Sequence, residues 1–166
     1  MITVGGLALA GTLVILGARL AAVPAPTPDL SQPGTPDNPR PVTVLMRDYV
    51  FNPTPLYLVA GETVELDVFN AGMVAHQLVL GGAVVQEAWR SADAAATPAG
   101  PLASPPAPSV AAAVGGVEVF LQPGESRKVR YTVPVTAQPS DPLQLVCQLP
   151  GHVERGMVGS VILASR

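Results

Sequence analysis

Two stretches of the sequence alternate between apolar and polar residues, and this alternation limits the fold more than any other feature. Within ETVELDVFN (62–70), the apolar Val64, Leu66 and Val68 are separated by acidic residues. SRKVRYTV (126–133) repeats the pattern with Val129, Tyr131 and Val133. Successive side chains of a strand point to opposite faces, so the alternation predicts strands with one buried face. Each stretch is entered through a Gly-Glu pair, in which Gly61 or Gly124 can adopt the positive φ of a tight turn.

Further short strands are predicted on both sides of these two. They are expected at residues 42–47, 76–80, 116–121, 143–147 and 157–163. Short strands separated by turn residues, with no long amphipathic helix among them, are typical of an antiparallel β-sandwich. We therefore predict an all-β domain over residues 42–166.

The N-terminus carries the most apolar part of the chain. Residues 2–18 are all apolar or small, and the apolar run resumes after Arg19 as far as Val23. Its length lies between that of a signal-peptide core and that of a short transmembrane helix. We predict a membrane anchor or signal segment at 1–23, with an uncleaved anchor favoured and a buried core helix as the alternative. An uncleaved anchor and a cleaved signal both place the domain outside the cytoplasm, either membrane-anchored or periplasmic.

Two other segments are rich in proline. Residues 24–41 read PAPTPDLSQPGTPDNPRP, and proline at this density blocks helices and central strands, which predicts an extended linker. A disordered leader is the alternative. Residues 88–115 are rich in Ala, Pro and Ser, and we predict an insertion loop there. This loop could include a helical turn near 86–92. A partner-docking loop and a flexible connection both fit this composition.

The residues with chemical potential are few and closely spaced. The chain has one cysteine and two histidines, and CQLPGHVERGM (147–157) places Cys147, His152 and Met157 in the spacing C-x4-H-x4-M. The other histidine, His76, begins a predicted strand. Two histidines, a cysteine and a weak axial methionine form the ligand set of a type 1 copper centre. Taken one at a time, a buried cysteine, a core methionine and a core or surface histidine are the alternative interpretations.

The local sequence explains how one short loop could supply three ligands. Cys147 lies on the same strand face as Leu145, so its sulfur is expected to point inward. Gly151 and Gly156 directly precede His152 and Met157 and allow the chain to turn twice. His76 would reach the same metal from another strand.

The segments CQLPGHVERGM and NAGMVAHQLVL (70–80) resemble the cupredoxin family, near its auracyanin, rusticyanin and sulfocyanin branch. The resemblance covers residues 42–166 apart from 88–115. It implies a Greek-key antiparallel β-sandwich that holds one type 1 copper ion. By the same resemblance, His76, Cys147 and His152 are the strong ligands and Met157 is the axial ligand.

The resemblance also implies a function. We expect a blue copper protein that carries single electrons between redox protein partners at the outer face of a membrane, and not an enzyme. A copper oxidase would need more histidines than the two present. The alternative is a copper chaperone or storage protein without redox cycling. A net charge of −3 argues against nucleic-acid binding, and we expect a monomer.

Overall fold

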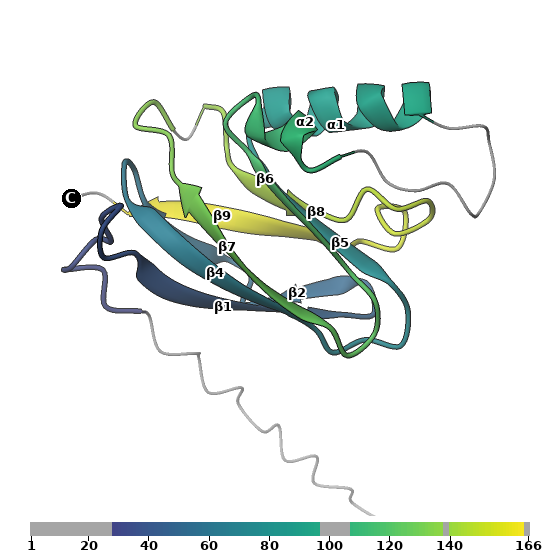
Figure 1. Ribbon diagram of the computed structural model, residues 1–166, viewed down its shortest axis with the longest axis horizontal. Coiled ribbons are helices and arrows are strands. Elements are labelled where there is room, and N and C mark those ends of the chain that lie inside the picture. Colours follow the sequence, from purple (N-terminus) through teal and green to yellow (C-terminus); the bar gives the residue numbers. More distant parts are fainter. Residues whose placement is uncertain (1–27, 97–106, 138–139, 165–166) are drawn as a thin grey trace, which may run out of the picture.

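Two β-sheets packed face to face form the body of the protein in the computed structural model, which describes residues 28–96, 107–137 and 140–164 (Figure 1). One sheet contains, in spatial order, β2 (Val50–Asn52), β1 (Arg40–Arg47), β4 (Thr63–Asn70) and β7 (Ser126–Thr132). The other contains β3 (Leu56–Val59), β9 (Val158–Ala164), β8 (Gln144–Val146), β5 (His76–Gly81) and β6 (Val117–Leu121). The predicted β-sandwich is confirmed.

Both sheets also contain a parallel pair, which the antiparallel prediction did not include. β1 pairs with β4 in parallel, and β3 pairs with β9 in parallel. Parallel neighbours need a crossover connection, and β2 and β3 provide it, because the chain leaves the first sheet after β2 and returns to it at β4. These two strands have three and four residues, too few for a clear alternating pattern.

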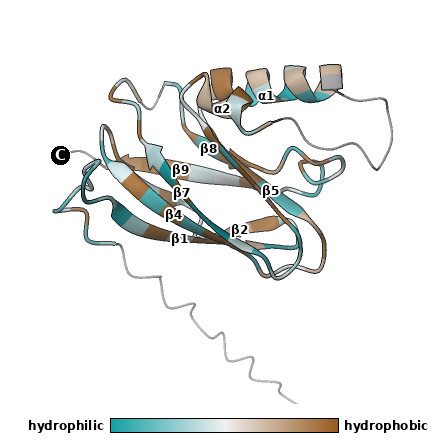
Figure 2. Cartoon of the chain, viewed as in Figure 1, coloured by the Kyte–Doolittle hydropathy of each residue, from teal (hydrophilic) through white to brown (hydrophobic). Residues whose placement is uncertain are grey.

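The alternating residues of the sequence form the core between the sheets. Val64, Leu66 and Val68 of β4 are fully buried, and apolar and polar residues alternate along this strand in Figure 2. β7 contributes Tyr131 at its inner face. Cys147 belongs to the same core cluster, so its side chain points inward as predicted.

A second, smaller core lies on the outer face of the five-stranded sheet. There α1 (Ala83–Ala96) and α2 (Ser109–Ala112) cover β5 and β6 (Figure 1). Val85 and Trp89, four residues apart on one face of α1, pack against Val79 of β5 and Ala111 of α2. β5 is therefore buried on both faces.

The helix α1 replaces the first part of the loop expected at 88–115, and it contains the helical turn predicted near 86–92. It has 14 residues and begins before the predicted insertion, because Val85 and Trp89 supply the apolar contacts that stabilise it on the sheet. Neither it nor any other helix of the described ranges is long and apolar enough to cross a membrane. The anchor or signal predicted at 1–23 lies outside the described residues.

The described part of the proline-rich segment is attached to the domain. Thr63 donates its N–H to the carbonyl oxygen of Gly34 at 3.0 Å, and the Gly34 N–H donates to the Glu62 carboxylate at 3.3 Å. A Cβ on Gly34 would lie 2.1 Å from the Thr63 carbonyl oxygen, so only glycine fits there. The folded part of the chain therefore begins before residue 42, and residues from Gly34 onward are not a free linker.

The carboxylate of Glu62 joins this segment to the sandwich. It is fully buried and forms a two-pronged ion pair with Arg40 of β1, at 2.6 and 2.9 Å. The Val59 N–H also donates to it at 2.8 Å. Burial by itself would raise the pKa of Glu62, but the Arg40 guanidinium and the Val59 amide outweigh burial and hold the pKa below its usual value.

We predict that Arg40→Ala lowers the free energy of unfolding by about 3–5 kcal/mol, because it leaves a buried carboxylate without its partner. Urea titration of the purified protein measures this loss. Lys128→Ala is the matched control, since its ion pair with Glu65 is exposed, and it should cost under about 1 kcal/mol. Equal losses in the two variants would contradict the role given to Glu62.

The contribution of Glu62 to stability also depends on pH. Because its pKa is lowered in the folded state, this contribution is present above the unfolded pKa and disappears as the pH falls through the folded pKa.

Candidate metal centre

Three of the four predicted ligand residues meet at one end of the sandwich. His76 is the first residue of β5, Cys147 directly follows β8, and His152 lies in the turn after it. The Nδ1 atom of His152 lies 3.2 Å from Cys147 Sγ and 3.3 Å from Nδ1 of His76. All three ligand atoms lie within 4.8 Å of one another. Two imidazole nitrogens and a sulfur at this spacing can coordinate a single ion.

The loop from 147 to 157 is closed by its own backbone. Cys147 donates its N–H to the Met157 carbonyl at 3.2 Å, and Met157 donates its N–H to the His152 carbonyl at 3.0 Å. Gly151 and Gly156 have φ of 80° and 87°, the left-handed values that the two predicted turns need. Met157 is fully buried in the same core cluster as Cys147. These bonds hold the loop in one conformation.

The sulfur of Cys147 is shielded from solvent. Its residue is fully buried, and the backbone N–H of Gln77 approaches Sγ at 3.4 Å. Burial raises the pKa of the Cys147 thiol, against the opposing effect of the amides of Leu149 and Gln77. A buried thiol with a raised pKa is a poor nucleophile, so this arrangement argues against covalent catalysis by Cys147.

The two histidines have different surroundings. His76 is fully buried, and its Nε2 lies 3.2 Å from Oδ1 of Asp48. His152 is half-buried, and this burial, with the nearby His76 and Arg155, lowers its pKa. His152 is therefore the histidine whose ring reaches the surface.

Asn70 positions the loop that covers His76. Its side-chain amide donates to the carbonyls of Val74 at 2.9 Å and Leu121 at 3.0 Å, and its Oδ1 accepts the N–H of Gly72 at 2.9 Å. Asn70 is fully buried at the end of β4. Asn70 was not singled out from the sequence. The available signal was a polar residue at an inward-facing position of a predicted strand.

Tyr49 contacts both histidines. Its ring stands edge-on to His76 and His152, with centroids 6.2 and 5.1 Å apart, and the Arg155 guanidinium lies 4.6 Å above it and hydrogen-bonds its hydroxyl. Tyr49 adopts a φ of 67°, unusual for a residue with a large side chain. Neither the conformation of Tyr49 nor the contact of Asp48 with His76 could be predicted from the sequence, because both depend on distant parts of the chain.

Solved structures share this fold. Auracyanin B superposes with a TM-score of 0.58 at 27% identity, over 80% of this chain and 95% of that one. A dithionite-reduced auracyanin of Roseiflexus castenholzii gives 0.54 at 18% identity, over 75% and 97% of the two chains. Auracyanin A of Chloroflexus aurantiacus, described as a "blue" copper protein, superposes with a TM-score of 0.50 at 24% identity. The match covers 75% of this chain and 99% of that one.

The chain belongs to the cupredoxin family. The fold of the auracyanins and the His-Cys-His cluster at one end of it, which fits a type 1 copper site, decide this together.

A curated relative adds a second comparison for this cupredoxin. The copper-resistant cuproprotein CopI of Rubrivivax gelatinosus is 32% identical over 127 residues. The match covers 75% of this chain and 66% of the relative, so the chain spans just under two thirds of that protein's length. No protein-family model matches the chain.

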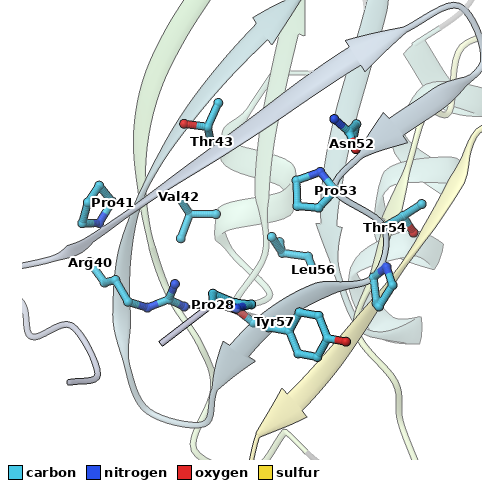
Figure 3. A pocket seen from close by; sticks show the side chains of 11 residues that line it. Pro28, Arg40, Pro41, Val42, Thr43, Asn52, Pro53, Thr54, Leu56 and Tyr57 are labelled. Atoms are coloured by element: carbon cyan, nitrogen blue, oxygen red, sulfur yellow. Dashed lines mark hydrogen bonds between the residues drawn. The ribbon is translucent and has the colours of Figure 1, made fainter. Parts of the chain in front are cut away.

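A cavity of about 550 Å³ lies away from the metal centre of this cupredoxin. It is lined by the start of β1 and by residues 52–57, whereas the other end of β1 leads to Asp48. Proline rings and the Arg40 side chain surround it (Figure 3). No histidine, cysteine or acidic side chain lines it, and Arg40 is already paired with Glu62. The cavity therefore offers no imidazole, thiolate or carboxylate to a metal.

Proposed function

We propose that this cupredoxin binds one copper ion through His76, Cys147 and His152, with Met157 as the weak axial donor, and that it carries single electrons between redox proteins. The convergence of two imidazole Nδ1 atoms and one thiol sulfur supports this most directly. When bound, copper supplies a one-electron Cu(II)/Cu(I) couple. The likeness to auracyanins supports the same assignment.

The way the ligands are held supports electron transfer. Cys147 and Met157 are buried in the core, and backbone hydrogen bonds close the loop between them. A side chain fixed by packing and hydrogen bonds moves little when the charge at the site changes. Little movement is what rapid exchange of an electron requires.

The test is the colour of the copper-loaded protein and its loss in Cys147→Ser. Loaded wild type should show the intense visible absorption of a copper–thiolate site, and Cys147→Ser should lose this band because the thiolate is its source. Met157→Leu is the matched control: it alters a buried, weak donor, so the band should remain while the reduction potential changes. Thermal melts of the metal-free variants check that each one folds. A band that survives in Cys147→Ser would refute the copper assignment.

The proposed contact surface for redox partners is the apolar patch of Met73, Val74 and Val153. These side chains are 84%, 40% and 41% exposed. Val153 follows the half-buried His152, and the Met73 N–H donates to Asp48 beside His76. A small apolar contact without strong ion pairs suits brief encounters, because it dissociates quickly.

We predict that Val153→Lys slows electron self-exchange between copies of the protein by about tenfold, a change of about 1.4 kcal/mol in the encounter. Two facing lysines repel each other and must be desolvated on contact. NMR line broadening in mixtures of oxidised and reduced protein measures the rate. Val135→Lys is the control, because Val135 is 81% exposed and lies in the turn after β7. An equal effect in both variants would move the contact surface elsewhere.

We also propose that the copper domain lies outside the cytoplasm. The apolar run at 1–23 supports anchoring or export by the N-terminus, with the copper domain outside the cytoplasm. We expect the domain to act as a monomer there.

Copper handling is the second candidate, and the name of the CopI relative favours it. A storage or delivery protein should release copper to a competing ligand without changing its oxidation state. The burial of His76, Cys147 and Met157 argues for retention. Repeated oxidation and reduction in the presence of a copper chelator separates the two: a carrier keeps its copper and its colour, whereas a delivery protein loses both.

A further inference from the structure

A carboxylate outside the predicted ligand set touches one of the proposed ligands. Asp48 lies in the turn after β1, and its Oδ1 is 3.2 Å from Nε2 of His76. The opposite ring nitrogen, Nδ1, faces Nδ1 of His152 at 3.3 Å. His76 thus stands between a carboxylate on one side and the proposed metal position on the other.

The neighbouring loop fixes the carboxylate in place. Met73 donates its N–H to the same Asp48 Oδ1 at 2.8 Å. The backbone of Gly72 closes over the contact, since a Cβ there would lie 2.5 Å from Asp48 Oδ1 and 2.7 Å from His76 Nε2. Asn70 holds Gly72 in turn. Asp48 therefore keeps its orientation although its side chain is 39% exposed.

The contact decides which nitrogen of His76 carries the proton. A neutral imidazole has one N–H and one lone pair. A buried N–H needs an acceptor, and Asp48 supplies one at Nε2, which leaves the Nδ1 lone pair directed toward Cys147 and His152. The pair selects the tautomer that a metal at this site requires.

We propose, on the basis of the function above, that Asp48 is a positioning residue for copper that fixes the His76 tautomer and favours the oxidised over the reduced ion. A carboxylate hydrogen-bonded to a ligating imidazole makes that imidazole a stronger donor. Its negative charge also stabilises the more positive ion. Both effects lower the reduction potential.

Asp48→Asn tests the electronic part, because asparagine keeps an oxygen for the Met73 and His76 N–H groups but removes the charge. The copper protein should stay blue, and its preference for Cu(II) over Cu(I) should fall about tenfold, which raises the potential by about 59 mV. Glu154→Gln is the matched control: it removes a charge close enough to influence His152 but forms no hydrogen bond to His76 among the described contacts. The reduction potential should rise in Glu154→Gln by less than half of its rise in Asp48→Asn. No shift in Asp48→Asn, or equal shifts in both, overturns the inference.

The tautomer is tested without copper. Nitrogen NMR of the metal-free protein should show His76 protonated at Nε2, with a slowly exchanging proton. Asp48→Ala should show a mixture of tautomers, and Asp48→Asn should restore the Nε2–H form. A single Nε2–H tautomer in Asp48→Ala contradicts the positioning role.

The two proposals fail in distinguishable ways. If the copper-loaded wild type is not blue, the proposed function fails while the tautomer result stands. If it is blue and Asp48→Asn does not change the reduction potential, only the role of Asp48 fails.

Discussion

The burial of Cys147 and Met157 in the core between the two sheets is the constraint on which the rest of the structure depends. Both residues belong to the cluster that includes the inner faces of β1, β4 and β5. The loop between them cannot relax without exposing core side chains, and its backbone hydrogen bonds keep His152 at a fixed distance from the sulfur. The packing that stabilises the fold therefore also sets the geometry of the metal centre.

This constraint leaves the two histidines in different surroundings. His76 is enclosed by Gly72, Asp48 and Tyr49 and has no exposed surface. His152 is half-buried beside an apolar surface. In the function proposed above, the enclosed histidine would tune the ion and the surface histidine would pass the electron. The sandwich separates these roles by taking one histidine from a strand and the other from a loop.

The part of the site that the sequence predicted is the part encoded locally. Alternation placed Cys147 inward, and the glycines before His152 and Met157 indicated the two turns. Asp48 and Tyr49 could not be predicted, because their contacts with His76 and His152 join segments more than twenty residues apart. Likewise, the strands were found by alternation, but the parallel pairs and the packing of α1 on β5 depend on how the chain crosses between layers.

The most direct measurement is the crystal structure of the copper-loaded protein. We predict one copper ion bound by Nδ1 of His76, Nδ1 of His152 and Sγ of Cys147, with Met157 as a more distant donor. The backbone of residues 147–157 should keep the hydrogen bonds seen here. Copper bound elsewhere, or through Nε2 of His76, or a loop that refolds to reach it, would contradict the claim that the folded core builds the site in advance.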